Sequence, residues 1–117
     1  MMNLCVLSVR AHLFLPGEKG VKHHHTRTGR GTKTVHFPTL PRVGEILQMA
    51  QSEGEYYSVD FTVRNVIYKF DTMMVISGYE IDLGAAQIND ADAFDKGMER
   101  WRKLGFHVSV EERPDAS

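Results

Sequence analysis

Hydrophobic and polar residues alternate along much of the chain, a pattern that favours β-strands. Within residues 4–15 the odd positions are apolar, whereas Ser8, Arg10 and His12 lie at even positions between them. Successive side chains of a strand point to opposite faces of a sheet, so this segment predicts a strand with one buried face. Pro16-Gly17 then ends the strand.

Five later segments also have the character of strands. They are Lys33–Phe37, Glu45–Met49, Glu55–Phe70, Met73–Leu83 and the last strand from Phe106 to Val110. The third of them changes the phase of its alternation at residues 65–67, which predicts a β-bulge that increases bend and twist. Long bent strands joined by short turns are typical of a sheet that curls toward closure.

One segment, Ala91–Leu104, has the spacing of an amphipathic helix. Asp90 or Asn89 can cap its beginning, and Gly105 is a natural residue just after its end. Its apolar face is formed by Phe94, Met98, Trp101 and Leu104. We expect this helix to cover one side of the sheet.

These elements predict an α+β fold. The sheet is expected to be strongly bent and antiparallel, or a partly open small barrel of the SH3-like type, with five to six strands and the C-terminal helix packed on it. We expect residues 1–117 to form a single domain. Residues 16–32 hold four glycines and a single aliphatic residue, Val21, and therefore predict a long basic loop rich in glycine and histidine.

Composition narrows the class of protein. With 42% apolar and 25% charged residues the chain has the make-up of a folded globular protein. Its one cysteine, Cys5, excludes an intramolecular disulfide and fits a reducing compartment, so a cytoplasmic location is expected. No apolar run approaches the roughly 20 residues that span a bilayer. We therefore expect no membrane association.

The net charge of −1 conceals an uneven distribution. Residues 1–42 contain seven Lys or Arg and one acidic residue, whereas residues 43–117 contain seven Lys or Arg and 14 acidic residues. A split of this kind predicts a basic surface that could contact a protein partner or a nucleic acid. The residues expected to form that contact are Lys22, Arg27, Arg30, Lys33, Arg42 and Tyr56.

The segment Phe37-Pro-Thr-Leu-Pro-Arg-Val-Gly-Glu45 carries a resemblance to a known group of proteins. It resembles small uncharacterised bacterial proteins of β-barrel type that contain an F-P-x-L-P-R-V-G-[DE] segment. The resemblance covers residues 35–83 and implies barrel geometry and no particular activity. The loop over residues 16–32 and the terminal helix lie outside it.

The consecutive histidines His23, His24 and His25 are weak candidates for a metal site. Neighbouring residues of an extended segment point in different directions, so three in a row rarely bind one ion together. We expect no metal and no other cofactor. Cys5 has no activating base near it in the sequence, and no other nucleophile has a catalytic motif. An enzyme is therefore not expected.

Two functions remain open from the sequence. The first is a non-enzymatic binding module that engages another protein, or a second copy of itself as a homodimer, through the edge of its sheet. The strands Met73–Leu83 and Phe106–Val110 are the candidates for that edge. The alternative is an accessory protein that binds nucleic acid through the basic residues of the loop.

Overall fold

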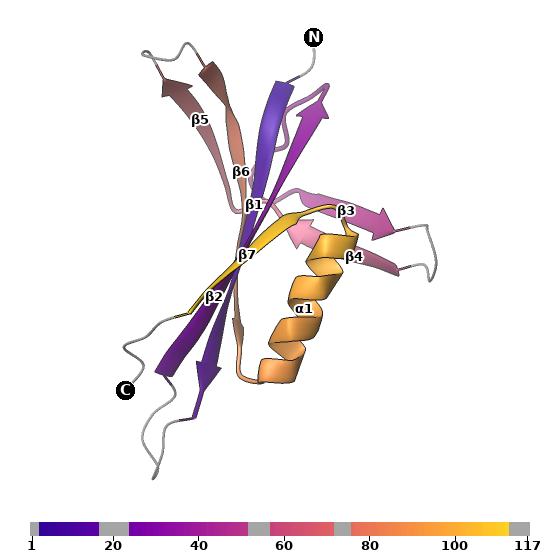
Figure 1. Ribbon diagram of the computed structural model, residues 1–117. Coiled ribbons are helices and arrows are strands. Elements are labelled where there is room, and N and C mark those ends of the chain that lie inside the picture. Colours follow the sequence, from indigo (N-terminus) through magenta and orange to yellow (C-terminus); the bar gives the residue numbers. More distant parts are fainter. Residues whose placement is uncertain (1–2, 17–23, 52–56, 72–75, 113–117) are drawn as a thin grey trace. The chain divides into compact units, whose positions relative to one another are not determined.

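The chain forms seven described strands and one helix (Figure 1). The computed structural model describes residues 3–16, 24–51, 57–71 and 76–112. In order along the chain, the elements are β1 (Asn3–Leu15), β2 (His24–Phe37), β3 (Ile46–Gln51), β4 (Tyr57–Thr62), β5 (Asn65–Asp71), β6 (Ile76–Ile88), α1 (Ala91–Lys103) and β7 (His107–Glu112). The prediction of an α+β fold with one C-terminal helix is confirmed.

The strands form one sheet of five and one of two. The larger has the order β5-β6-β1-β2-β7, and β3 pairs with β4 in an antiparallel hairpin in which Ile46 lies opposite Thr62. The larger sheet begins with β5 and ends with β7, so it does not close into a barrel. The strand expected at Met73–Leu83 corresponds to β6, which lies inside this sheet and is not the edge that the sequence suggested.

The predicted strand Glu55–Phe70 is in fact two strands, which raises the number above the expected five to six. β4 pairs with β3, whereas β5 pairs with β6, with Tyr68 opposite Tyr79. Between them the Val63 N–H donates to the Glu45 carbonyl at 2.8 Å, and the Arg64 N–H donates to the Asp82 carbonyl at 2.7 Å. The phase change therefore marks the point at which the chain passes from one sheet to the other.

The predicted loop over residues 16–32 is wrong for its second half, because β2 begins at His24. Residues 17–23 lie outside the described part of the chain. Gly29, one of the glycines that suggested a loop, has a packing role instead. A Cβ atom at Gly29 would overlap the Met98 sulfur and lie 3.2 Å from Phe94 Cζ, so glycine allows β2 to approach the helix closely.

The chain packs as two compact units that share strands. Unit 1 comprises Met1–Val9 and Thr32–Gly84, and unit 2 comprises Arg10–Gly31 and Ala85–Ser117. β1, β2 and β6 each contribute residues to both. The expectation of a single domain stays a prediction. Buried apolar side chains among the described residues of unit 1 include Cys5, Leu7, Val9, Phe61, Val63, Ile81 and Leu83.

The core of unit 2 lies between α1 and the strands. Ala11, Leu13, Phe94 and Met98 are buried there. Leu15, Ile88, Ala91, Trp101 and Val108 pack around them. The predicted alternation of β1 and the predicted apolar face of the helix are both confirmed by this burial.

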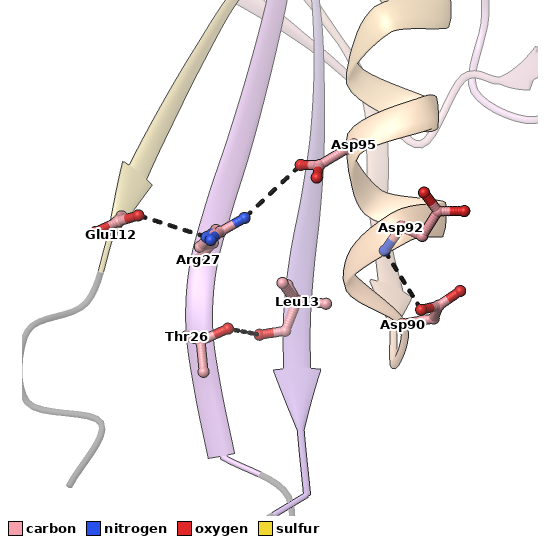
Figure 2. A network of polar contacts seen from close by, with 7 residues as sticks. All are labelled: Leu13, Thr26, Arg27, Asp90, Asp92, Asp95 and Glu112. Atoms are coloured by element: carbon pink, nitrogen blue, oxygen red, sulfur yellow. Dashed lines mark hydrogen bonds and ion pairs between the residues drawn. The ribbon is translucent and has the colours of Figure 1, made fainter.

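The ends of α1 follow the predicted capping pattern. The Asp90 carboxylate accepts a hydrogen bond from the Asp92 N–H at 3.3 Å (Figure 2). At the other end Leu104 is the C-cap, and Gly105 has a positive φ of 94°. Glycine adopts this left-handed conformation without the steric cost that a Cβ would bring.

Candidate functional site

The first candidate surface is the edge strand β5 of unit 1. Phe70 is 66% exposed and Tyr68 is 54% exposed, although both are large and apolar. Strand pairing places Val66, Tyr68 and Phe70 on one face, and Val66 lies opposite the buried Ile81. The two rings therefore lie on the same face of the sheet as the core, at positions that other side chains leave exposed.

These rings contact one another. Tyr68 stacks on Phe70 with ring centroids 6.4 Å apart, and it meets Tyr79 of β6 at 5.0 Å. On the other face of the strand, the Lys69 ammonium forms an ion pair of 3.0 Å with Glu80. We name Tyr68, Phe70 and Tyr79 the edge ring cluster. The strand thus presents apolar rings and a compensated charge.

The second candidate surface lies in unit 2, on the face of β1 and β2 that points away from α1. Arg10, His12 and Phe14 alternate with the buried Ala11 and Leu13, so they point to that face. Thr28 of β2 contacts His12 with 3.2 Å between Oγ1 and Nδ1, which places it on the same face.

His25 joins this group through a change in the alternation of β2. Residues three apart in a regular strand point to opposite faces, yet His25 Nε2 lies 2.7 Å from Thr28 Oγ1. The alternation is therefore interrupted between them, as in a β-bulge. The His25 ring stacks on Phe14 with centroids 5.0 Å apart, and it meets the edge of His12 at 4.9 Å.

Hydrogen bonding assigns a proton to Nε2 of His25. His25 Nε2 lies 2.8 Å from the Arg27 carbonyl, which can only accept, so this nitrogen carries a proton. The Thr28 hydroxyl oxygen, 2.7 Å away, accepts from this nitrogen and also lies 3.2 Å from His12 Nδ1, so one hydroxyl contacts both imidazoles. Thr28 is only 6% exposed, so its hydroxyl fixes both rings from within.

Arg30 completes this surface. It lies two residues beyond Thr28, and therefore on the same face, and it is exposed. We name Arg10, His12, Phe14, His25, Thr28 and Arg30 the imidazole face. It combines two guanidinium groups with three half-buried rings, a composition suited to an anionic ligand that also has flat surfaces.

Arg27, predicted as a contact residue, points toward α1 instead. Its Nη1 lies 3.7 Å from the Asp95 carboxylate of the helix, and its Nε lies 3.5 Å from the Glu112 carboxylate of β7 (Figure 2). Two acidic side chains thus compensate its charge within unit 2. Arg27 is a poorer contact for an anionic partner than Arg30 for this reason.

The other predicted contact residues are distributed over the chain. Lys33 and Arg42 belong to unit 1, whereas Arg30 belongs to unit 2. Arg42 is exposed, its N–H donates to the Glu45 carboxylate at 2.8 Å, and it lines an open groove of about 770 Å³ formed by residues 37, 39–45 and 47. Lys22 and Tyr56 lie outside the described residues.

The histidine triplet does not form a described metal centre. His23 lies outside the described residues, and His24 and His25 are the first residues of β2. Within the described ranges no three His, Cys, Asp or Glu side chains gather closely enough to hold a metal ion. Nor does that part of the chain contain a helix long and apolar enough to cross a membrane.

Cys5 is fully buried in the core of unit 1. Burial raises the pKa of its thiol above the ordinary value, because the charged thiolate is poorly solvated there. This environment is typical of a structural cysteine and unlike that of a reactive one.

Sequence reasoning missed the imidazole face as a group, although part of the signal was present. The polar alternation of residues 4–15 puts Phe14 at an even position, in line with Arg10 and His12. An aromatic residue on the polar face of a strand is a sign of a contact surface. The contribution of His25 could not be found in this way, because it depends on the irregular alternation of β2.

Comparison with known proteins gives no relative: no protein-family model matches the chain, and no curated protein and no solved structure shows significant similarity to it. The resemblance of residues 35–83 to small bacterial proteins of β-barrel type stays a prediction. A functional proposal must therefore rest on the two surfaces themselves.

Proposed function

We propose that this protein is a non-enzymatic cytoplasmic binding module that self-associates by pairing its edge strand β5 with β5 of a second copy. The observation that carries the proposal is the exposure of Phe70, stacked on Tyr68, along a strand at the end of the sheet. Edge strands offer backbone N–H and C=O groups to a further strand, and exposed rings beside them add apolar area.

β5 also has few of the features that protect edges from pairing. It contains no proline, and its one lysine, Lys69, is held by Glu80 at 3.0 Å. The other edge, β7, carries the exposed acidic residues Glu111 and Glu112. Charges of one sign repel a second copy, so β5 is the better candidate of the two edges.

A second copy suits β5 because one register matches it to itself. In an antiparallel pair centred on Tyr68, Phe70 lies opposite Val66 of the second copy, and the two tyrosines face each other across the twofold axis. This register brings apolar residues together on one face. It also places Lys69 opposite Ile67 of the second copy, so the two lysines are diagonal neighbours and do not lie directly opposite each other, where like charges would be unfavourable.

Sedimentation velocity from about 1 μM to about 1 mM protein tests the proposal, a range suited to weak association. We expect the sedimentation coefficient of the wild type to rise with concentration, and Phe70→Lys to remain monomeric. Ile46→Lys is the matched control, because Ile46 of β3 is 64% exposed, close to the 66% of Phe70. A monomeric wild type over the whole range would overturn the proposal.

A cysteine substitution tests the register separately. Tyr68→Cys places two thiols opposite each other across the twofold axis, within the distances that a disulfide requires. We expect mild oxidation to give a covalent dimer, whereas Val43→Cys, at another exposed position of unit 1, gives little. The natural Cys5 does not compete, because it is fully buried.

A further inference from the structure

We infer that the imidazole face of unit 2 binds single-stranded nucleic acid. The inference concerns a different unit and different residues from the edge strand β5, and it does not depend on self-association. It also differs from the binding loop expected from the sequence, because its contacts come from the two strands β1 and β2.

The distribution of charge in unit 2 supports an anionic ligand on this face. The acidic residues Asp90, Asp92, Asp95 and Glu99 lie at the cap of α1 or on the helix, and Glu112 pairs with Arg27. The face away from the helix carries Arg10 and Arg30. Of the described acidic residues of unit 2, Glu111 alone alternates to that face, since Val108 of the same strand packs toward the helix.

The rings indicate why the ligand is a nucleic acid in single-stranded form. Phe14 and His25 are stacked with an interplanar angle of 22°, and the Thr28 hydroxyl holds His25 and His12 in place. A pre-formed stack on the sheet face away from α1 can be extended by an unpaired base. In a duplex the bases are already stacked on their neighbours, and their flat surfaces are not available to these rings.

Arginine contributes to both parts of such a ligand. Guanidinium groups form paired hydrogen bonds with phosphate and stack on bases, so Arg10 and Arg30 can follow the backbone beside the rings. Arg10 is half-buried and lies two residues before His12 on β1, and Arg30 is exposed and lies two residues after Thr28 on β2. The ring nitrogens of the imidazoles add hydrogen-bonding groups for base edges.

Fluorescence anisotropy with labelled oligonucleotides of about 12 nucleotides tests the inference, a length within the span of small sheet-based binding domains. The probes are oligo(dT) and oligo(U), with a duplex of the same length and unlabelled heparin as competitors. At low salt we expect single strands to bind and the duplex and heparin to compete weakly. Equal competition by heparin would overturn the role of the rings, and no binding to either single strand would overturn the inference.

Variants separate the charge from the rings. Arg10→Gln with Arg30→Gln should lower the slope of log affinity against log salt by about 1.4, since each phosphate contact on a single strand contributes about 0.7. The matched control is Arg102→Gln with Lys103→Gln on the helix, which should leave the slope unchanged. An unchanged slope in the first pair, or an equal drop in the control, would contradict the inference.

Phe14→Leu tests stacking while it retains an apolar side chain. We expect the affinity for single strands to fall about tenfold, within the range found when a stacking ring is removed. Since Phe14 is half-buried, each variant is first compared with the wild type by circular dichroism, and Arg30→Gln alone serves as an exposed substitution that spares the fold. A folded Phe14→Leu protein with unchanged affinity would contradict the role of the ring.

Discussion

The two units share three strands but differ in how far their large apolar side chains are buried. In unit 2, Phe94 of α1 is 0% exposed and packs with Ala11, Leu13 and Met98. In unit 1, Phe70 of β5 is 66% exposed, and its ring contact is with another exposed residue, Tyr68. An aromatic side chain on a helix that packs on strands is removed from water, whereas one at the end of an edge hairpin is not.

This difference distinguishes the apolar surface that stabilises the fold from the apolar surface available for the proposed self-association. Burial of apolar surface is the main favourable term in folding, so the core of unit 2 contributes to the folded state itself. The same kind of surface left exposed on β5 contributes little to folding, and in the proposed self-association a second copy would cover it. Two phenylalanines of one chain are therefore expected to act on different equilibria.

Phe94→Ala is the strongest test of that difference. We expect it to lower the free energy of unfolding by about 3–5 kcal/mol, because it leaves a cavity under the helix. Phe70→Ala, the matched control, is expected to change it by less than about 0.5 kcal/mol, as exposed substitutions do. Urea unfolding followed by circular dichroism at low protein concentration measures both, and similar losses would show that Phe70 is buried in the folded chain.

Substitution of Gly84, the last residue of unit 1, is expected to have an intermediate effect on the free energy of unfolding. Its φ is +91°, and β6 changes its alternation there, since Leu83 and Ile81 are buried before it and Ile88 packs after it. Gly84→Ala should cost about 1–2 kcal/mol, because a Cβ destabilises the left-handed conformation. A Cβ here would also lie 3.1 Å from Arg64 Cγ, in a side chain that can move aside.

Gly44→Ala is the control for Gly84→Ala. Gly44 has nearly the same φ, +93°, but nothing lies within 4 Å of the position that its Cβ would take. Its cost in urea unfolding should therefore be the conformational part alone. If Gly84→Ala lowers the free energy of unfolding much more than Gly44→Ala does, the Arg64 side chain is fixed in place. If the two losses are equal, the Arg64 side chain moves aside.

The parts of the fold that depend on local pattern could be predicted from the sequence. The odd positions 5–13 of β1 are buried as their alternation indicates, and α1 begins after Asp90 and is followed by Gly105 in the left-handed conformation. Alternation and capping are properties of neighbouring residues, so they can be detected before the fold is known.

The parts that depend on distant contacts could not be predicted. The sequence predicts a loop where the first part of β2 lies, because His24–Thr32 holds two glycines and no aliphatic residue, yet Gly29 is needed where Met98 and Phe94 approach. Similarly, nothing local shows that Arg27 turns toward Asp95 and Glu112, whereas Arg30 does not. The position of Gly29 and the orientation of Arg27 depend on contacts with α1 and β7, which follow β2 by more than 50 residues along the chain.

Asp90→Ala is expected to have the smallest effect on the free energy of unfolding, and it tests whether the two units unfold together. Loss of the cap should lower the free energy of unfolding by about 1 kcal/mol, while Asp90→Asn, which still accepts the Asp92 N–H, should cost little. Hydrogen exchange distinguishes the units, because only unit 2 has a described helix. We expect faster exchange of the α1 amides with unchanged exchange in β3 and β4. Equal acceleration of exchange in β3 and β4 would mean that the two units, which share β1, β2 and β6, unfold together.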